Sequence, residues 1–106
     1  MKLEGRKLGI LISAAPANRN FQHAIHLTER ALNAGVQVFL YFIDDAVTAI
    51  DSQAVRKLKE GGARLYSCAY SLQKRNLPMS EGIIPAGLTI LNDIIASTDR
   101  FVSFTA

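Results

Sequence analysis

Residues 8–43 read LGILISAAPANRNFQHAIHLTERALNAGVQVFLYFI, and this segment decides the fold. Residues 8–13 form a short apolar run, which is typical of a strand buried on both faces. From Asn20 onward, apolar side chains recur at helical spacing until Gly35, a residue type that commonly follows the end of a helix. Residues 36–43 are rich in β-branched and aromatic side chains and predict a second buried strand. The segment therefore predicts a β-α-β unit with two parallel strands.

The rest of the chain continues this alternation of strands and helices. We expect a short helix capped by Asp51 or Ser52, a third strand over 64–67, a short helix over 69–76, a longer helix over 86–97 and a last strand over 101–105. The helix over 86–97 carries more aliphatic side chains than one stripe needs, so it is either sandwiched inside the domain or shared with another subunit. The alternation predicts an α/β protein, a single-domain three-layer α/β sandwich with a mostly parallel sheet of about five strands.

Composition limits the classes of function. The chain has 106 residues, of which 49% are hydrophobic and 20% are charged, and its formal net charge is +3. These values exclude disorder, and the basic residues are too scattered to indicate nucleic acid as the main partner. The longest apolar stretch is less than half of the ~20 residues that a transmembrane helix requires, so we expect no membrane association. A single cysteine and the lack of a signal segment favour the cytoplasm as the location.

Cys68 is the only cysteine, and it lies where the third predicted strand meets the following short helix. A thiol at a helix N-terminus meets unpaired backbone N–H groups and the positive end of the helix dipole, and both favour the thiolate. Lys74 and Arg75 would add thiolate-stabilising charge if the short helix turned them back toward the sulfur. The alternative is an inert core cysteine, because free cysteine is among the most buried residue types. Position alone leaves both interpretations open.

Two further segments follow predicted strands in the same way as Cys68. They are the loop 13–19 and the pair Asp44 and Asp45. In an open parallel sheet, reactive groups collect in the loops after the carboxyl ends of the strands, so we expect all three to lie at one edge. For the two aspartates, a role in a turn or a helix cap is favoured over a paired acid/base role, because adjacent side chains on an extended chain diverge.

Other chemical motifs find no support in the sequence. His23 and His26 lie opposite the apolar stripe of the first predicted helix, which favours a solvated surface over a metal site. The first loop, SAAPANRN, contains no glycine and matches neither the dinucleotide-binding motif nor the P-loop. A serine-hydrolase motif is also missing. We therefore expect neither a bound cofactor nor a metal.

Residues 68–76, CAYSLQKRN, resemble the active-cysteine segment of the DsrE/TusD-like sulfur-relay family, which has the DsrE/DsrF-like fold. In that family a cysteine is followed by a short helix that ends in basic residues. Three further segments fit the family: the opening LGILISAAP, the helix FQHAIHLTERALNAG leading into VQVFLYFIDDAV, and the terminal GLTILNDIIASTDRFVSF. The resemblance therefore covers nearly the whole chain.

The resemblance implies that residues 1–106 form a single DsrE-like domain that assembles into homo-oligomers, as trimers or hexamers. It implies a sulfur carrier or sulfurtransferase subunit that passes persulfide sulfur through Cys68 between donor and acceptor proteins of a sulfur relay. One alternative is a non-catalytic assembly or regulatory subunit of the same fold with a structural cysteine. Another is small-molecule binding at the carboxyl edge of the sheet.

Overall fold

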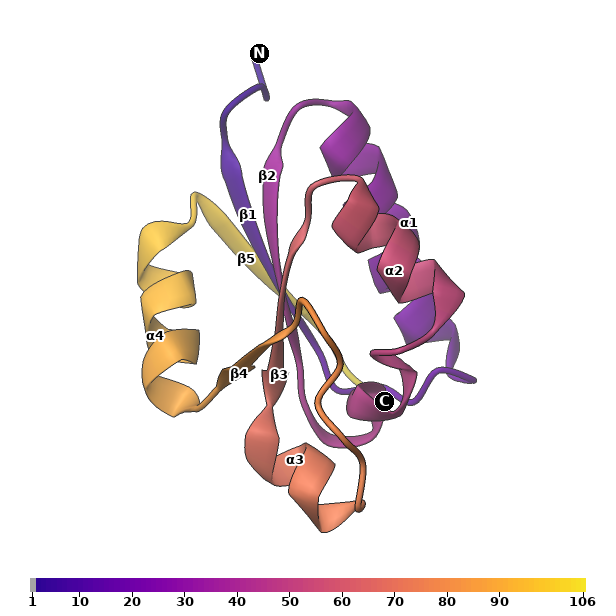
Figure 1. Ribbon diagram of the computed structural model, residues 1–106. Helices are drawn as coiled ribbons and strands as arrows, with labels where there is room; N and C mark the ends of the chain where they lie inside the picture. The colour runs from indigo at the N-terminus through magenta and orange to yellow at the C-terminus, as the bar shows by residue number, and fades with distance from the viewer. Residues whose placement is uncertain (1) are drawn as a thin grey trace.

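A five-stranded parallel sheet organises the chain, and the computed structural model describes residues 2–106 (Figure 1). The strand order is β4-β3-β2-β1-β5, and each pair of neighbouring strands is parallel. The strands are β1 (Lys7–Ile12), β2 (Gln37–Phe42), β3 (Arg64–Cys68), β4 (Ile84–Ala86) and β5 (Arg100–Phe104). The predicted α/β class is confirmed, and the sheet is entirely parallel.

Helices cover both faces of this sheet, as a three-layer sandwich requires. The helices α1 (Arg19–Asn33) and α2 (Gln53–Glu60) lie on one face, and α4 (Leu88–Ser97) lies on the other (Figure 1). The short helix α3 (Ala69–Lys74) follows β3 directly and projects beyond the sheet. A 3₁₀ helix, η1 (Asp44–Ala49), connects β2 to α2.

The first β-α-β unit forms as its sequence pattern predicts. Asn18 caps α1, because its side-chain oxygen accepts the backbone N–H of Asn20 at 2.8 Å. The apolar stripe of α1 faces the sheet, with Phe21 and Ile25 buried. Gly35 follows the helix with φ of 83°, a left-handed conformation that glycine adopts without a steric penalty.

Three elements differ from the sequence prediction. The strand β4 lies between the helices predicted over 69–76 and 86–97, where the sequence predicts no strand, since it has only three residues and includes Pro85. It pairs with β3 alone, and proline is tolerated there because an edge strand has one side free of ladder hydrogen bonds. Residues 44–49 form η1 rather than a plain turn, and the predicted helix over 86–97 begins at Leu88 because β4 occupies its first residue.

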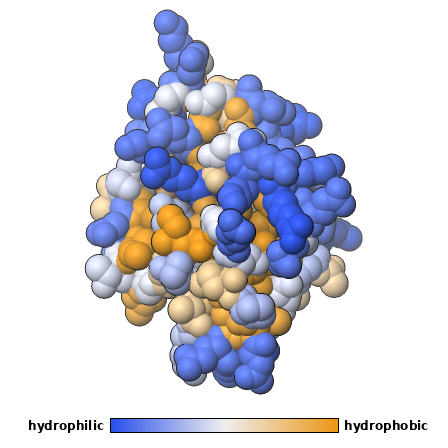
Figure 2. All heavy atoms as spheres, in the orientation of Figure 1, coloured by the Kyte–Doolittle hydropathy of each residue, from blue (hydrophilic) through white to orange (hydrophobic). Residues whose placement is uncertain are grey.

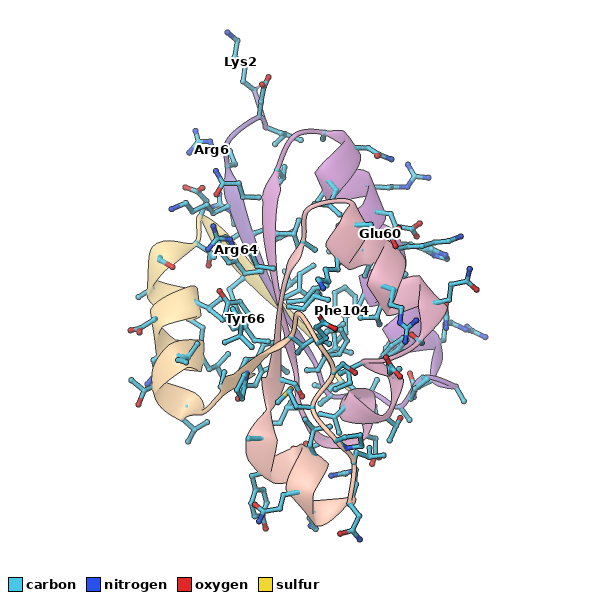
Figure 3. All side chains as sticks on the ribbon, viewed as in Figure 1. Lys2, Arg6, Glu60, Arg64, Tyr66 and Phe104 are labelled. Atoms are coloured by element: carbon cyan, nitrogen blue, oxygen red, sulfur yellow. The ribbon has the colours of Figure 1, made fainter. Side chains whose placement is uncertain are left out.

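The core has two unequal parts, one on each face of the sheet. On the side of α1 and α2, here called the α1–α2 face, side chains such as Ile10 and Leu40 are fully buried. On the side of α4, here called the α4 face, the buried members of the core cluster are Tyr41, Ala86 and Ile94, and the aromatic and aliphatic side chains around them are only partly covered. Figure 3 shows the Tyr66 side chain between the sheet and α4.

Candidate functional site

Cys68 is the last residue of β3 and the N-cap of α3. Its Sγ accepts a hydrogen bond from the backbone N–H of Ser71 at 3.5 Å, so the sulfur itself caps the helix. The thiol is free of any disulfide and the residue is half-buried. The predicted position at the strand–helix junction is confirmed.

Cys68 belongs to the core cluster on the α4 face, and Tyr41 is a buried polar side chain of the same cluster. Tyr41 lies on β2, is fully buried, and donates its hydroxyl hydrogen to the carbonyl oxygen of Ala86 at 3.0 Å. Ala86 is also the register partner of Cys68 in the adjacent strand, so the sulfur and the hydroxyl meet at the same point of the sheet. Burial, and to a lesser degree the neighbouring Cys68 sulfur, raise the pKa of Tyr41 to about 12.

The two basic residues singled out beside Cys68 lie at the opposite end of α3. Lys74 ends the helix with its side chain exposed, and Arg75 follows it. The Arg75 guanidinium binds the Asp45 carboxylate at 2.8 Å and the carbonyl oxygen of Ser71 at 3.1 Å. Arg75 therefore ties α3 to η1, and a direct effect of either residue on the thiolate stays a prediction.

The loops at the carboxyl edge converge only in part. The backbone N–H of Asp44 donates to the Ser71 hydroxyl at 3.0 Å, so η1 and α3 pack together beside Cys68. Both aspartates lie in the first turn of η1, as a turn role predicts. The loop 13–19 meets the end of β5 instead, because the backbone N–H of Ser13 donates to the carbonyl oxygen of Phe104 at 3.0 Å. The site therefore consists of the ends of β2 and β3 with η1 and α3.

Other candidate sites lie away from Cys68. His23 and His26 are exposed on α1, in agreement with the solvated surface that the sequence predicts. Within residues 2–106, no group of three histidine, cysteine or acidic side chains is placed to hold a metal ion. None of the helices in the same residues combines the length and the apolar character that crossing a bilayer requires.

Three surface clefts also lie away from the sulfur. One of about 520 Å³ lies between α2 and residues 80–83, one of about 530 Å³ lies at the amino ends of β1 and β5, and one of about 360 Å³ lies at the amino ends of β2 and β3. None of the three is lined by Cys68, so they give no support to small-molecule binding at the carboxyl edge.

Sequence reasoning missed Tyr41 as part of the site. In the run VQVFLYFI every position except Gln37 looks apolar, and only the register of β2 with β3 shows which side chains share a face with Cys68. The available signal was the hydroxyl itself, since a polar group inside a doubly covered strand needs a hydrogen-bond partner.

Comparisons with known proteins agree with this architecture. The crystal structure of the ychN protein from E. coli matches with a TM-score of 0.70 and 22% sequence identity, over 93% of this chain and 99% of that chain. The structure of BT1422 from Bacteroides thetaiotaomicron, a conserved protein of unknown function, matches with a TM-score of 0.64 and 12% identity, over 92% of this chain and 93% of that one. At these identities both likenesses show the fold alone.

Sequence comparison gives the family. No curated protein matches the chain. The profile of the DsrE/DsrF-like family matches residues 6–104, which is nearly the whole length and includes every strand and helix described above. The chain belongs to the DsrE/DsrF-like family, a family of sulfur-relay proteins.

Proposed function

We propose that this protein is a sulfur carrier that receives sulfur from a donor persulfide on Cys68 and passes it to an acceptor protein. The observation that carries the proposal is the placement of a free, half-buried thiol as the N-cap of α3, at the carboxyl edge of the sheet. The sulfur accepts a hydrogen bond from the chain and its residue is only half-buried, which supports access for a protein-to-protein transfer. Membership of a sulfur-relay family supports the same chemistry.

The transfer proceeds by thiol exchange in two balanced steps. The Cys68 thiolate attacks the outer sulfur of the donor persulfide, a new S–S bond forms on Cys68, the donor S–S bond breaks, and the donor leaves as a thiolate. In the second step an acceptor thiolate attacks the outer sulfur of the Cys68 persulfide, and Cys68 leaves as a thiolate. No external oxidant is needed, because each S–S bond that breaks is replaced by another. A free thiol of this kind requires a reducing compartment, for which we propose the cytoplasm.

Residues around the sulfur support this exchange by holding α3 in place. Ser71 donates its backbone N–H to the sulfur and accepts the Asp44 N–H with its hydroxyl, so one residue joins the thiol to η1. The pair between Arg75 and Asp45 anchors the other end of the helix. Because the sulfur is already held in place, less entropy is lost when the donor docks, and transfer is favoured.

The test is incubation of the native protein with a small-molecule persulfide, followed by measurement of its intact mass. We expect the wild-type chain to gain one sulfur atom and Cys68→Ser to gain none, because Cys68 is the only thiol. Alkylation of the native protein by iodoacetamide provides a second readout of access to the sulfur. An unchanged wild-type mass together with resistance to alkylation would show that Cys68 is structural.

A second candidate function, an assembly subunit of the relay, is favoured by the apolar surface of the α4 face. In α4 itself, Leu88 is 70% exposed and Ile95 is 46% exposed, and Ile84 on the edge strand β4 is 46% exposed. Figure 2 shows hydrophobic side chains gathered on the surface in the region of α4 and the sheet beside it. Exposed apolar patches of this kind mark interfaces, so we propose that copies of this chain associate through the α4 face.

Association through this face gives a defined expectation for size in solution. We expect a homo-oligomer, a trimer or hexamer, by light scattering at micromolar concentration, and Leu88→Glu should shift it toward monomers. A wild-type monomer at these concentrations would contradict the assembly. The mass assay separates the two functions, since an assembly subunit without carrier activity would form the oligomer and gain no sulfur.

A further inference from the structure

The Tyr41 hydroxyl has one proton and two neighbouring acceptors. In the structure it donates to the Ala86 carbonyl oxygen at 3.0 Å. Ala86 is the register partner of Cys68, and Tyr41 and Cys68 lie on the same face of the sheet in one core cluster, so the sulfur is the second acceptor near this hydroxyl. Tyr41 is fully buried, so water does not compete for this hydrogen bond. When Cys68 is a neutral thiol, its S–H can donate to the tyrosine oxygen while the tyrosine donates to Ala86. When the sulfur is an anion, that donation is lost and the sulfur becomes the stronger acceptor.

We propose that Tyr41 is a positioning residue for Cys68, whose hydroxyl turns from the Ala86 carbonyl to the sulfur when the sulfur carries negative charge. The inference deepens the proposed function, because the same contact would hold the anionic sulfur of the thiolate before loading and of the leaving thiolate after transfer. Rotation about the phenolic C–O bond is sufficient for the switch, so neither β2 nor β3 has to move.

Two features of the site suit Tyr41 to this task. Its pKa, raised to about 12, keeps the hydroxyl protonated across the pH range in which a thiol ionises, so a donor is always present. It is also the only one of the ionisable side chains on the surrounding elements that is buried. The others are exposed or half-buried: Arg64 and Tyr66 on β3, Tyr70, Lys74 and Arg75 on and after α3, Asp44 and Asp45 in η1, and Asp93 on α4.

The experiment compares the rate of Cys68 alkylation by iodoacetamide against pH in the wild type and in Tyr41→Phe. This substitution removes the hydroxyl and keeps the ring. We expect alkylation at neutral pH to slow about tenfold in Tyr41→Phe, because a hydrogen bond to a charged acceptor is lost. At about pH 10, where the thiolate is formed in both proteins, the rates should converge. A merely structural role would change the rate equally at all pH values.

Tyr66→Phe is the matched control, because Tyr66 is the register partner of Tyr41, lies on the same face and is half-buried. Its profile should coincide with that of the wild type. Coincident profiles for Tyr41→Phe and the wild type would overturn the inference while leaving sulfur loading untouched. A shifted profile in a protein that gains no sulfur from a persulfide would instead refute the carrier function and leave the inference standing.

A measurement on chains that retain Tyr41 covers the case in which Tyr41→Phe does not fold. The protein has three tyrosines, so labelling them with ¹³C at Cζ and removing the other two as Tyr66→Phe and Tyr70→Phe assigns the Tyr41 signal. We expect this signal to move when Cys68 ionises and to stay fixed over the same pH range in Cys68→Ser. A Tyr41 signal that does not respond to Cys68 would overturn the inference.

Discussion

The two faces of the sheet differ in how completely they are covered, and the sulfur proposed to carry the chemistry lies on the less covered one. On the α1–α2 face, two helices cover side chains such as Ile10, Leu40 and Leu65, which are at most 2% exposed. On the α4 face, a single helix covers a cluster in which Phe39, Tyr66 and Cys68 stay partly exposed. We therefore propose that the α1–α2 face supplies most of the stability and that the α4 face presents the sulfur to its partners.

This division has a physical basis in what each face requires. A close-packed core excludes water, and its side chains transmit any change in volume. Such a core suits a structural scaffold. A nucleophilic sulfur needs a route for its partner and a charge-stabilising surrounding, which a fully covered core does not offer. Cys68 fits these needs of a proposed carrier, since it is half-buried, belongs to the cluster of the α4 face and accepts the Ser71 N–H with its sulfur.

The largest expected effect comes from truncating the well-covered face. Ile10→Ala should lower the free energy of unfolding by about 3 kcal/mol, because it removes a fully buried side chain and leaves a cavity. Ile90→Ala on α4 should cost only about 1 kcal/mol, since Ile90 is partly exposed. Urea unfolding at one protein concentration measures the free energy of unfolding of both variants. Equal losses of stability would contradict the proposed difference between the faces.

The next effect concerns the pH dependence of stability that Tyr41 confers. The pKa of Tyr41 is raised from 10.0 to about 12 in the folded protein, so the folded state holds its proton more tightly than the unfolded chain. The resulting stabilisation is complete below pH 10 and is lost as the pH rises to about 12, an expected fall of about 2–3 kcal/mol. Urea unfolding at steps of pH should show this fall in the wild type and a smaller one in Tyr41→Phe.

A weaker effect is expected where α3 is tied to η1. Arg75→Gln removes the ion pair with Asp45, and Asp45→Asn removes the same pair from the other side. Either change should lower stability by about 0.5–1 kcal/mol, because the pair lies at the surface and is screened by water. The double variant should lose little more than either single variant. Additive losses would show that the two side chains act independently.

The smallest effect is expected at Lys74. Its side chain is exposed at the end of α3, and the six residues of that helix separate it from Cys68 by about 9 Å along the axis. Two unit charges about 9 Å apart in water interact by only about 0.5 kcal/mol, and salt at 0.1 M reduces this further, so Lys74→Ala should slow alkylation of Cys68 by less than about twofold. If Lys74→Ala slows alkylation more than this and the difference disappears in high salt, Lys74 stabilises the thiolate, as its proximity in sequence predicts.

Much of the α1–α2 face could be predicted from sequence, because periodic apolar patterns report directly on burial. The helix α1, its stop at Gly35 and the strands β1 and β2 follow from such patterns. The strand β4 could not be predicted in this way, since three residues that include Pro85 carry no period, and pairing with β3 determines their conformation.

The candidate site divides in the same way. Cys68 could be placed from local sequence alone, because a strand ending at a helix start is a local pattern. Its neighbours could not be placed in this way. Tyr41 lies near the sulfur but belongs to β2, and Asp45 contacts the end of α3 but belongs to η1, each about thirty residues away in sequence. Contacts of that kind depend on strand register, which one sequence does not report.

The most direct test of the account is the onward transfer of sulfur from Cys68. The wild-type protein is loaded with a small-molecule persulfide, separated from the donor and mixed with a thiol acceptor, and the intact masses of both are followed over time. The account predicts that the protein returns to its unmodified mass while the acceptor gains one sulfur atom, and that Cys68→Ser neither loads nor transfers. Sulfur that never loads, or that stays on Cys68 in the presence of the acceptor, would contradict the role of the α4 face in sulfur transfer.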